Sequence, residues 1–254
     1  MLVADYHTHT TYSHGKGSVL DNAMYAKKMG LKSIAITDHG FGHIAFGIKR
    51  KEVAKLRADI DKAIRQTGVN IYLGIEANIR SFNGDVDVKK SDFDSLQLLV
   101  VGFHNFVKAP ILEWCRFVFG NVLANLFKIV SKRRIKRNTQ AYIKALNRYP
   151  IDIISHLNYT CRVDCYEVAK ACEQTNTYIE LNGKRVHFSK KDVEDMLKTN
   201  VKFVINSDAH KKERVGDAGC GIEMAKMYGI PLDRIVNLHE EIIVKSKTNF
   251  EDKV

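Results

Sequence analysis

Residues 2–14, LVADYHTHTTYSH, join a short apolar run to three histidines that fall within eight residues, His7, His9 and His14. A single histidine is most often an ordinary core or surface residue. A His-x-His pair at the end of a predicted strand, with a third histidine nearby, is instead a candidate metal-binding pattern. Strands that end in such side chains recur along the chain, and this repetition decides the fold.

Short apolar runs alternate with helix-like segments through most of the chain. The runs are mostly continuous, which is typical of parallel strands buried on both faces. We expect seven strands, at residues 2–7, 32–38, 70–77, 96–103, 151–156, 177–182 and 201–208. Apolar residues at helical spacing predict helices at 19–30, 49–68, 164–175, 189–200 and 217–229. The alternation indicates an α/β fold with a parallel sheet, either open or closed into a barrel.

The bulk properties predict one globular domain. No linker or repeat divides the 254 residues, so we expect a single domain at 1–254. The N-terminus shows no secretory leader, and the five cysteines form no Cys-x-x-Cys pair, which favours reduced thiols and a cytoplasmic location. The net charge of +11 favours an anionic partner. The oligomeric state is not predicted.

Residues 109–138 do not fit the alternation, and we interpret them as a hydrophobic and basic helical insertion. Between Lys108 and Gln140 the chain has eight Lys or Arg residues and one acidic residue, Glu113. Glu113, Arg116 and Lys128 argue against a membrane span, which needs an almost uncharged stretch. Three interpretations stay open: a buried insertion, a lid or dimer contact, or a helix on a membrane surface.

Metal-type side chains fall at or just after the ends of the predicted strands. The set comprises seven histidines and two carboxylates: His7, His9, His14, His39, Glu76, His104, His156, Asp208 and His210. The carboxyl ends of parallel strands meet at one face, so we expect these side chains to converge. Imidazole and carboxylate ligands suit zinc, manganese or iron, and nine are enough for two or three ions. Glu76 could bridge two ions, an arrangement used in phosphoester hydrolysis. His43, His187 and His239 fall outside the set.

The strings HTH, SHG, TDHG, GIEAN, GFH, ISH and SDAH, in this order, resemble the PHP (polymerase and histidinol phosphatase) superfamily. The sequence looks most similar to its single-domain phosphatases of the YcdX type. The resemblance implies a distorted (β/α)7 barrel with three divalent metal ions at the C-terminal face of the strands. It assigns His7, His9, Glu76 and Asp208 to the first ion, Glu76, His104 and His156 to the second, and His14, His39 and His210 to the third.

The resemblance also implies the activity. We expect a metal-dependent phosphomonoesterase that hydrolyses a small phosphorylated metabolite through a metal-activated hydroxide, with zinc as the first choice of metal and manganese or iron as alternatives. Asp208, Glu76 and His210 are the candidate catalytic residues, and Arg185 and Arg214 are the candidates for binding substrate phosphate. One alternative is a phosphodiesterase or exonuclease on single-stranded nucleic acid, guided by the basic residues 128–137. Another is a non-catalytic, metal-stabilised scaffold.

Smaller expectations concern residues beside the predicted strand ends. We expect Asn158 and Asn182 to form hydrogen bonds that orient the metal ligands. We expect His187 to be a surface residue.

Overall fold

The computed structural model describes residues 2–245 and contains a parallel sheet whose strand order follows the chain. Within this range the strands are β1 (Ala4–Thr8), β2 (Ser33–Ile36), β3 (Asn70–Asn78), β4 (Leu98–Gly102), β5 (Ile153–Ile154), β6 (Tyr178–Asn182) and β7 (Phe203–Asn206). Each strand pairs in parallel with the next. All seven predicted strands are confirmed, with ends shifted by no more than two residues.

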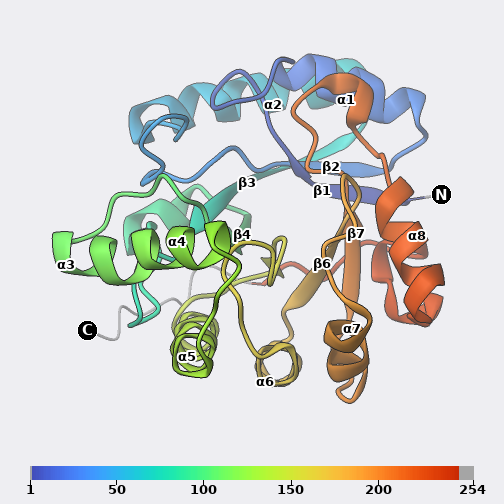
Figure 1. Cartoon of the computed structure of the whole chain (residues 1–254). Helices are drawn as coiled ribbons and strands as arrows, with labels where there is room; N and C mark the ends of the chain where they lie inside the picture. The colour runs from blue at the N-terminus through green and yellow to red at the C-terminus, as the bar shows by residue number, and fades with distance from the viewer. Residues whose placement is uncertain (1, 246–254) are drawn as a thin grey trace.

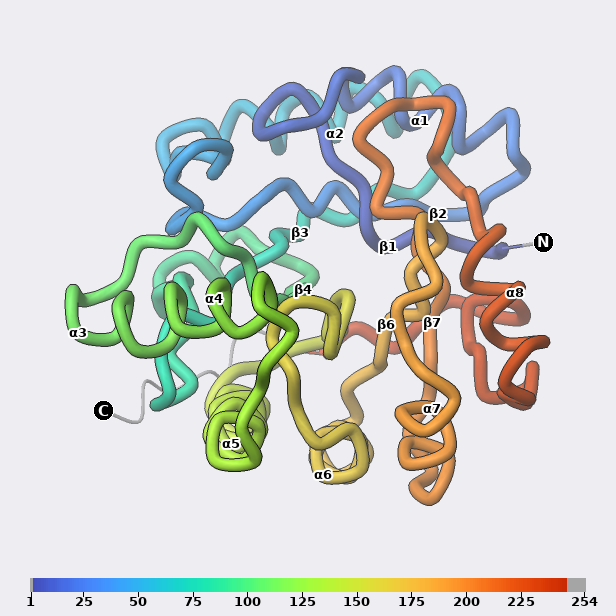
Figure 2. The backbone as a smooth tube through the Cα atoms, in the orientation of Figure 1, coloured from blue at the N-terminus to red at the C-terminus, as the bar shows by residue number. Residues whose placement is uncertain are grey.

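The sheet curls until β1 lies beside β7, as the backbone trace shows (Figure 2). Thr8 and Ala209 form a parallel bridge, and the His9 amide donates to the Ala209 carbonyl at 2.8 Å. Deeper in the barrel, the Asn206 side chain accepts a hydrogen bond from the Tyr6 amide at 3.0 Å and so replaces a bond of the strand ladder. The result is a nearly closed, distorted barrel of the predicted α/β class.

Helices surround the barrel and follow the strands in sequence. They are α1 (Val19–Lys28), α2 (Val53–Thr67), α5 (Lys132–Arg148), α6 (Cys165–Gln174), α7 (Lys190–Leu197) and α8 (Gly219–Tyr228). In Figure 1, α1 and α2 lie on one side of the barrel, and α5, α6 and α7 lie on the opposite side. This right-handed β-α succession places every strand's carboxyl end at the same end of the barrel.

Local sequence signals fix the helix ends. Ser189 and Asp192 form a capping box at the start of α7, in which each side chain accepts a hydrogen bond from the other's backbone N–H. Helix α2 ends at Gly68, whose φ of 74° is a left-handed conformation that favours glycine. Helix α1 ends at Lys28, two residues before the predicted end at residue 30, with Met29 as the C-cap and Gly30 following it at a φ of 73°.

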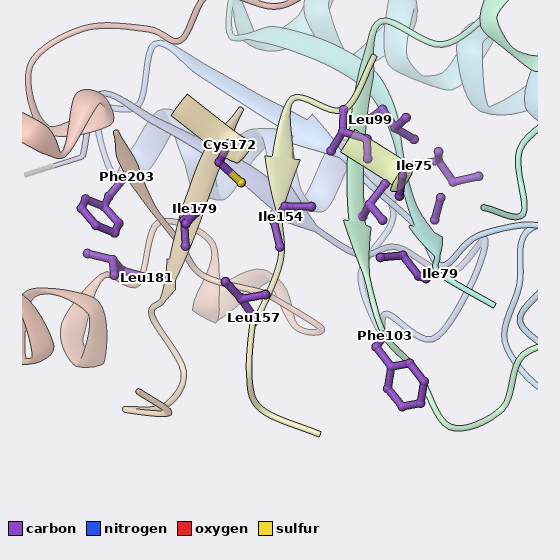
Figure 3. Packing of buried hydrophobic residues seen from close by; sticks show 14 of the residues in the cluster. Ile75, Ile79, Leu99, Phe103, Ile154, Leu157, Cys172, Ile179, Leu181 and Phe203 are labelled. Atoms are coloured by element: carbon purple, nitrogen blue, oxygen red, sulfur yellow. The ribbon is translucent and has the colours of Figure 1, made fainter. Parts of the chain in front are cut away.

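Apolar side chains form two layers, one outside and one inside the barrel. The outer layer packs the strands against the helices, and Figure 3 shows part of it, including Leu99, Ile154 and Ile179 from three neighbouring strands. The inner layer fills only the amino-terminal end of the barrel. On β6, for example, Tyr178 belongs to the inner apolar cluster, and Glu180, two residues further on, faces the same interior. The carboxyl end of the interior is thereby left to polar side chains.

A β-bulge in β1 changes the direction of one candidate ligand. Asp5 pairs with Ile34 but Thr8 pairs with Ile36, so β1 has one extra residue between the two pairs. Such a bulge interrupts the alternation of side chains. In a regular strand, neighbouring side chains point to opposite faces. Here Tyr6 belongs to the inner cluster, and the bulge allows the next residue, His7, to point into the barrel as well, where it reaches Glu180.

The segment predicted as an insertion is helical, and one side of it is exposed. It contains α3 (Ile111–Glu113), a π-helical stretch (Trp114–Phe119) and α4 (Gly120–Leu126), at one edge of the molecule in Figure 1. Phe117 and Val118 are fully buried. The interpretation as a buried insertion is nevertheless wrong for much of the segment, because large apolar side chains are exposed at Ile111, Leu112, Phe119, Leu126, Phe127 and Ile129. Among the described residues, no helix has the length and apolar character required to cross a bilayer.

Candidate metal centre

The predicted metal-type side chains meet at the carboxyl end of the barrel. His7 lies in β1, Glu76 lies in β3, and His104 follows β4. The backbone of two members is held in left-handed conformations that are rare for non-glycine residues, with φ of 31° at His156 and 51° at Asp208. Such strain occurs mainly where function requires a particular side-chain direction.

Glu76 occupies the middle of the cluster and is 1% exposed. Its Oε1 lies 2.9 Å from His156 Nε2, 3.3 Å from His7 Nε2 and 3.4 Å from His104 Nε2. Its Oε2 lies 3.0 Å from His39 Nδ1. Four imidazoles therefore lie within 3.4 Å of one carboxylate, and a fifth, that of His9, lies 3.7 Å from Oε2.

Asp208 forms the second focus of the cluster. Its Oδ1 lies 3.4 Å from His9 Nε2 and 3.4 Å from His210 Nδ1. The His7 Nε2 atom lies between the two carboxylates, 3.9 Å from Asp208 and 3.3 Å from Glu76.

In residues 2–245, three triads bring ligand atoms within 4.8 Å of one another, namely His7/His9/Glu76, His39/Glu76/His104 and His9/His39/His210. The last differs from the predicted third group, because His9 takes the place of His14. The His14 ring stacks on Phe46 at 4.2 Å between centroids and meets His210 edge-on at 5.1 Å. His14 thus lies beside the cluster, at its margin.

Glu180 is a functional candidate that the sequence analysis missed. It is fully buried in β6, and its Oε1 lies 2.7 Å from His7 Nδ1, on the opposite side of that ring from Glu76. Its Oε2 accepts a hydrogen bond from the His156 amide at 3.0 Å. A carboxylate in this position fixes the ring orientation and the tautomer of a candidate ligand. The available signal was an acidic residue inside the predicted strand 177–182, at the same face as Tyr178 and Asn182.

Other buried side chains orient the remaining histidines. Asn78 Oδ1 lies 2.6 Å from His104 Nδ1, and Asn78 is held in turn by Asp87, which accepts from its amide at 2.7 Å and its side-chain nitrogen at 2.6 Å. Asp38 accepts from the Thr10 amide at 2.7 Å and the Thr10 hydroxyl at 2.6 Å, and so fixes the loop that follows His9.

Two asparagines that we expected to support the ligands have different surroundings. Asn182 donates to Glu180 at 3.2 Å and to Asp208 at 3.4 Å, as expected. Asn158 instead accepts from the Val163 amide and stabilises the loop after β5.

Two histidines outside the predicted set are not ordinary surface residues. The His43 ring stacks on His39 at 4.9 Å and is buried, so it extends the ring of imidazoles. His187 is partly buried beside Phe188, with a centroid distance of 4.2 Å, and burial lowers its pKa to about 4. The expectation of a surface residue is thus met only in part, because the Nε2 atom of His187 is buried. Sequence gave no sign of either position, because both residues lie in loops.

Charges inside the cluster are strongly coupled. Burial alone would raise the pKa of Glu76, but the imidazoles of His104 and His7 outweigh it and hold that pKa well below its usual value. Burial would lower the pKa of His7, but the carboxylates of Glu76 and Glu180 outweigh it and raise that pKa well above the usual value. Burial lowers the pKa of His210 to about 4, so this ring is neutral near pH 7, the form that binds metals.

A cavity of about 220 Å³ opens over the cluster. Its lining includes Glu76, Asp208 and His210, the three candidate catalytic residues, together with Tyr159 and Arg185. The Arg185 guanidinium lies over the Tyr159 ring at 4.5 Å from its centroid. Arg185 is therefore placed where it can meet a ligand of the cavity.

Arg214, the second candidate for binding substrate phosphate, lies outside the cavity. Arg214 is not among the residues that line the cavity, and its Nη1 pairs with Asp217 Oδ2 at 2.8 Å. Nearer to the cluster, Lys184 Nζ lies 3.8 Å from Asp208 Oδ2.

A parallel barrel with imidazoles and carboxylates converging at its carboxyl end has the design of a metal-dependent hydrolase. The chain belongs to the PHP domain family, whose family model matches residues 5–207. This membership confirms the family that the sequence motifs resemble. It supports the predicted class of enzyme, a metal-dependent phosphoester hydrolase.

Solved structures share the fold at low sequence identity. A histidinol phosphate phosphatase from Lactococcus lactis, in complex with zinc, L-histidinol and phosphate, is 14% identical, with a TM-score of 0.56 over 89% of this chain and 91% of the other. A histidinol phosphatase candidate from Listeria monocytogenes is 12% identical, with a TM-score of 0.59 over 84% and 97%. At these identities the comparison establishes a common fold.

Proposed function

We propose that this protein is a metal-dependent phosphoesterase that hydrolyses a small phosphomonoester. The observation that carries the proposal is the convergence of four imidazoles on Glu76, at 2.9 to 3.4 Å, under a small cavity. A cluster of this kind would lower the stability of the fold if it had no other role, because burying several ionisable groups together costs desolvation free energy.

The donor set fits divalent metal ions. Within the described part of the chain, His9 Nδ1, His39 Nδ1 and Glu76 Oε2 are buried and form no hydrogen bond, although the last two atoms lie 3.0 Å apart. Buried polar atoms normally have partners, and an ion held between these groups would supply one. We propose that the nine predicted side chains hold two or three ions. His14 is the most peripheral of the nine.

We propose zinc as the native metal, with manganese or iron as alternatives. Imidazole nitrogen with a minority of carboxylate oxygen suits all three metals. The zinc in the Lactococcus lactis relative supports the first choice. The L-histidinol in that structure is not transferred to this chain.

We assign different roles in the reaction to Asp208, Glu76 and His210. When bound, the ions would activate a water molecule and withdraw charge from the phosphoryl oxygens. Asp208 is 12% exposed and lines the cavity, so it can accept or return a proton there. Glu76 is buried beneath and orients the imidazoles, and His210 lines the cavity beside Asp208.

The cavity favours a small monoester over a nucleic acid strand. Its volume of about 220 Å³ suits a compact ligand, and Arg185 offers a charged donor for a terminal phosphate. The basic residues of 128–137, which would guide a strand, are absent from the residues that line it. The single domain at 1–254 and the cytoplasmic location stay predictions.

The first experiment compares two substrates under one set of conditions. Protein purified without chelators is supplied with zinc or manganese and given an aryl phosphate monoester or a labelled single-stranded oligonucleotide. We expect phosphate release from the monoester and an intact oligonucleotide. Nucleotide release would favour the nuclease alternative, and a metal-loaded protein that hydrolyses neither would favour the scaffold alternative.

Substitutions test the site directly. Glu76→Ala and His156→Ala should lose metal and most activity, and His239→Ala, an exposed histidine outside the cluster, is the matched control. Arg185→Gln should lower kcat/KM by about 10- to 100-fold, the value of a charged hydrogen bond to phosphate. Arg214→Gln is its control, and equal losses in both variants would contradict the assignment of Arg185.

A further inference from the structure

The exposed apolar residues of the insertion lie next to an unusual concentration of positive charge. We define the docking surface by two sets of side chains. Its apolar members are Ile111, Leu112, Phe119, Leu126, Phe127 and Ile129. Its basic members are Arg116, Lys128, Lys132, Arg133, Lys136 and Arg137. All twelve are exposed.

Three of the six apolar members recur at helical spacing, and the other three lie at the two ends of the helical segment. Leu112, Phe119 and Leu126 are spaced seven residues apart, about two helical turns, and are 56%, 43% and 69% exposed. The opposite face is anchored by the fully buried Phe117 and Val118. An exposed apolar face of this kind marks an interaction site.

The basic members adjoin that face because α5 packs against the π-helical stretch. Arg134 Nη1 donates to the Arg116 carbonyl at 3.1 Å, which ties the two segments together. Arg116, Arg133 and Arg137 line an open groove of about 670 Å³ between them. In residues 2–245, none of these arginines forms an ion pair with a carboxylate.

The charge pattern points to an anionic partner. No acidic residue occurs between Glu113 and Asp152 in the sequence, and the Glu113 carboxylate accepts from the Phe82 amide at 3.0 Å. The first turn of α5 carries Lys132, Arg133 and Arg134, at the helix end that is already positive. This arrangement of like charges is unfavourable unless anions lie opposite.

We propose that the docking surface binds the surface of a membrane that contains anionic phospholipids. The apolar members would enter the boundary between headgroups and acyl chains, and the basic members would lie against lipid phosphates. A second copy of the chain is a poorer occupant, because a two-fold interface would bring the same cations together. Nucleic acid is also poorer, because only two of the six apolar members are aromatic and the other four are aliphatic and do not stack on bases.

Trp114 provides a local probe, since it is the one tryptophan of the sequence and lies within the π-helical stretch. Full-length protein is mixed with vesicles of phosphatidylcholine alone, or with about 30% phosphatidylserine, at low and high salt. We expect a blue shift of the tryptophan emission and co-sedimentation with the anionic vesicles only. High salt should weaken both, because it screens the attraction.

Matched variants separate the two components of the surface. Lys132→Gln/Lys136→Gln should weaken binding to anionic vesicles about 30-fold, at about 1 kcal/mol per cation. Phe127→Ser/Ile129→Ser should weaken it at least about tenfold through lost insertion. The control, Lys226→Gln/Met227→Ser, removes one exposed cation and one exposed apolar side chain from α8, on the other side of the molecule in Figure 1, and should leave binding unchanged.

Three results would overturn the proposal. The first is no binding to anionic vesicles at low salt, or equal binding by all variants. The second is a dimer, without vesicles, that the docking-surface variants dissociate. The third is an oligonucleotide that binds these residues while the vesicles do not. None of these measurements requires turnover, so the outcome is independent of the proposed phosphatase activity.

Discussion

Replacing Glu180 with glutamine removes one negative charge from the interior of the barrel while keeping the shape of the side chain. In the native structure this carboxylate holds His7 Nδ1 at 2.7 Å and accepts from the His156 amide at 3.0 Å and from Asn206 Nδ2 at 3.2 Å. Glutamine has one acceptor oxygen, so its NH₂ group would face at least one of these donors. Loss of such a partner behind a metal-binding imidazole costs about 10- to 100-fold in metal affinity, or about 1.4 to 2.8 kcal/mol.

The assay is a competition between the protein and a fluorescent zinc chelator, performed on the wild type and on Glu180→Gln. Glu194→Gln is the control, because Glu194 lies on α7 with its side chain 56% exposed. The melting temperature of the metal-free proteins is measured in parallel, since a purely structural role would lower it without changing zinc affinity in the folded state. Zinc affinity within about twofold of the wild type would refute the role assigned to Glu180.

Three further predictions concern packing and metal. Gly102→Ala should reduce activity with little change in overall fold, because a Cβ at this position would lie 2.7 Å from His156 Cε1; an unchanged rate would mean that His156 can move without loss. Removal of metal by a chelator should lower the melting temperature by about 5 to 10 °C, if the ion is present at about 100 times its Kd, and re-addition of zinc should restore it. Phe117→Ala should destabilise the protein by about 3 to 5 kcal/mol in urea unfolding, whereas Phe127→Ala, 65% exposed, should change stability by less than about 0.5 kcal/mol. Equal effects at the two positions would contradict the one-sided packing of the insertion.

Several features could be predicted from the sequence because they depend on local patterns. Parallel strands buried on both faces read as continuous apolar runs, so even the two-residue strand β5 was located from residues 151–156. The position of His39, Glu76 or His104 relative to the strands followed from the same pattern. The topology of a parallel sheet then required these side chains to lie at one end.

Other features depend on contacts between distant segments and left little trace in the sequence. Glu180 is 173 residues from His7 along the chain, and only closure of the barrel makes them partners. The stacking of His43 on His39 follows from the course of a loop. The peripheral position of His14 beside Phe46 has the same origin.

The sequence by itself determined the strands and most of the side chains at their carboxyl ends, because these depend on periodicity and on the geometry common to all parallel βα units. Only the tertiary structure decided which oxygen of Glu76 meets which imidazole, since the β1 bulge and the positive φ of His156 and Asp208 set those directions. It also decided that the apolar residues of the insertion divide between a buried face and an exposed one. Apolar side chains have the same sequence signature whether a neighbouring segment covers them or leaves them exposed, and the cover comes from parts of the chain that are remote in sequence.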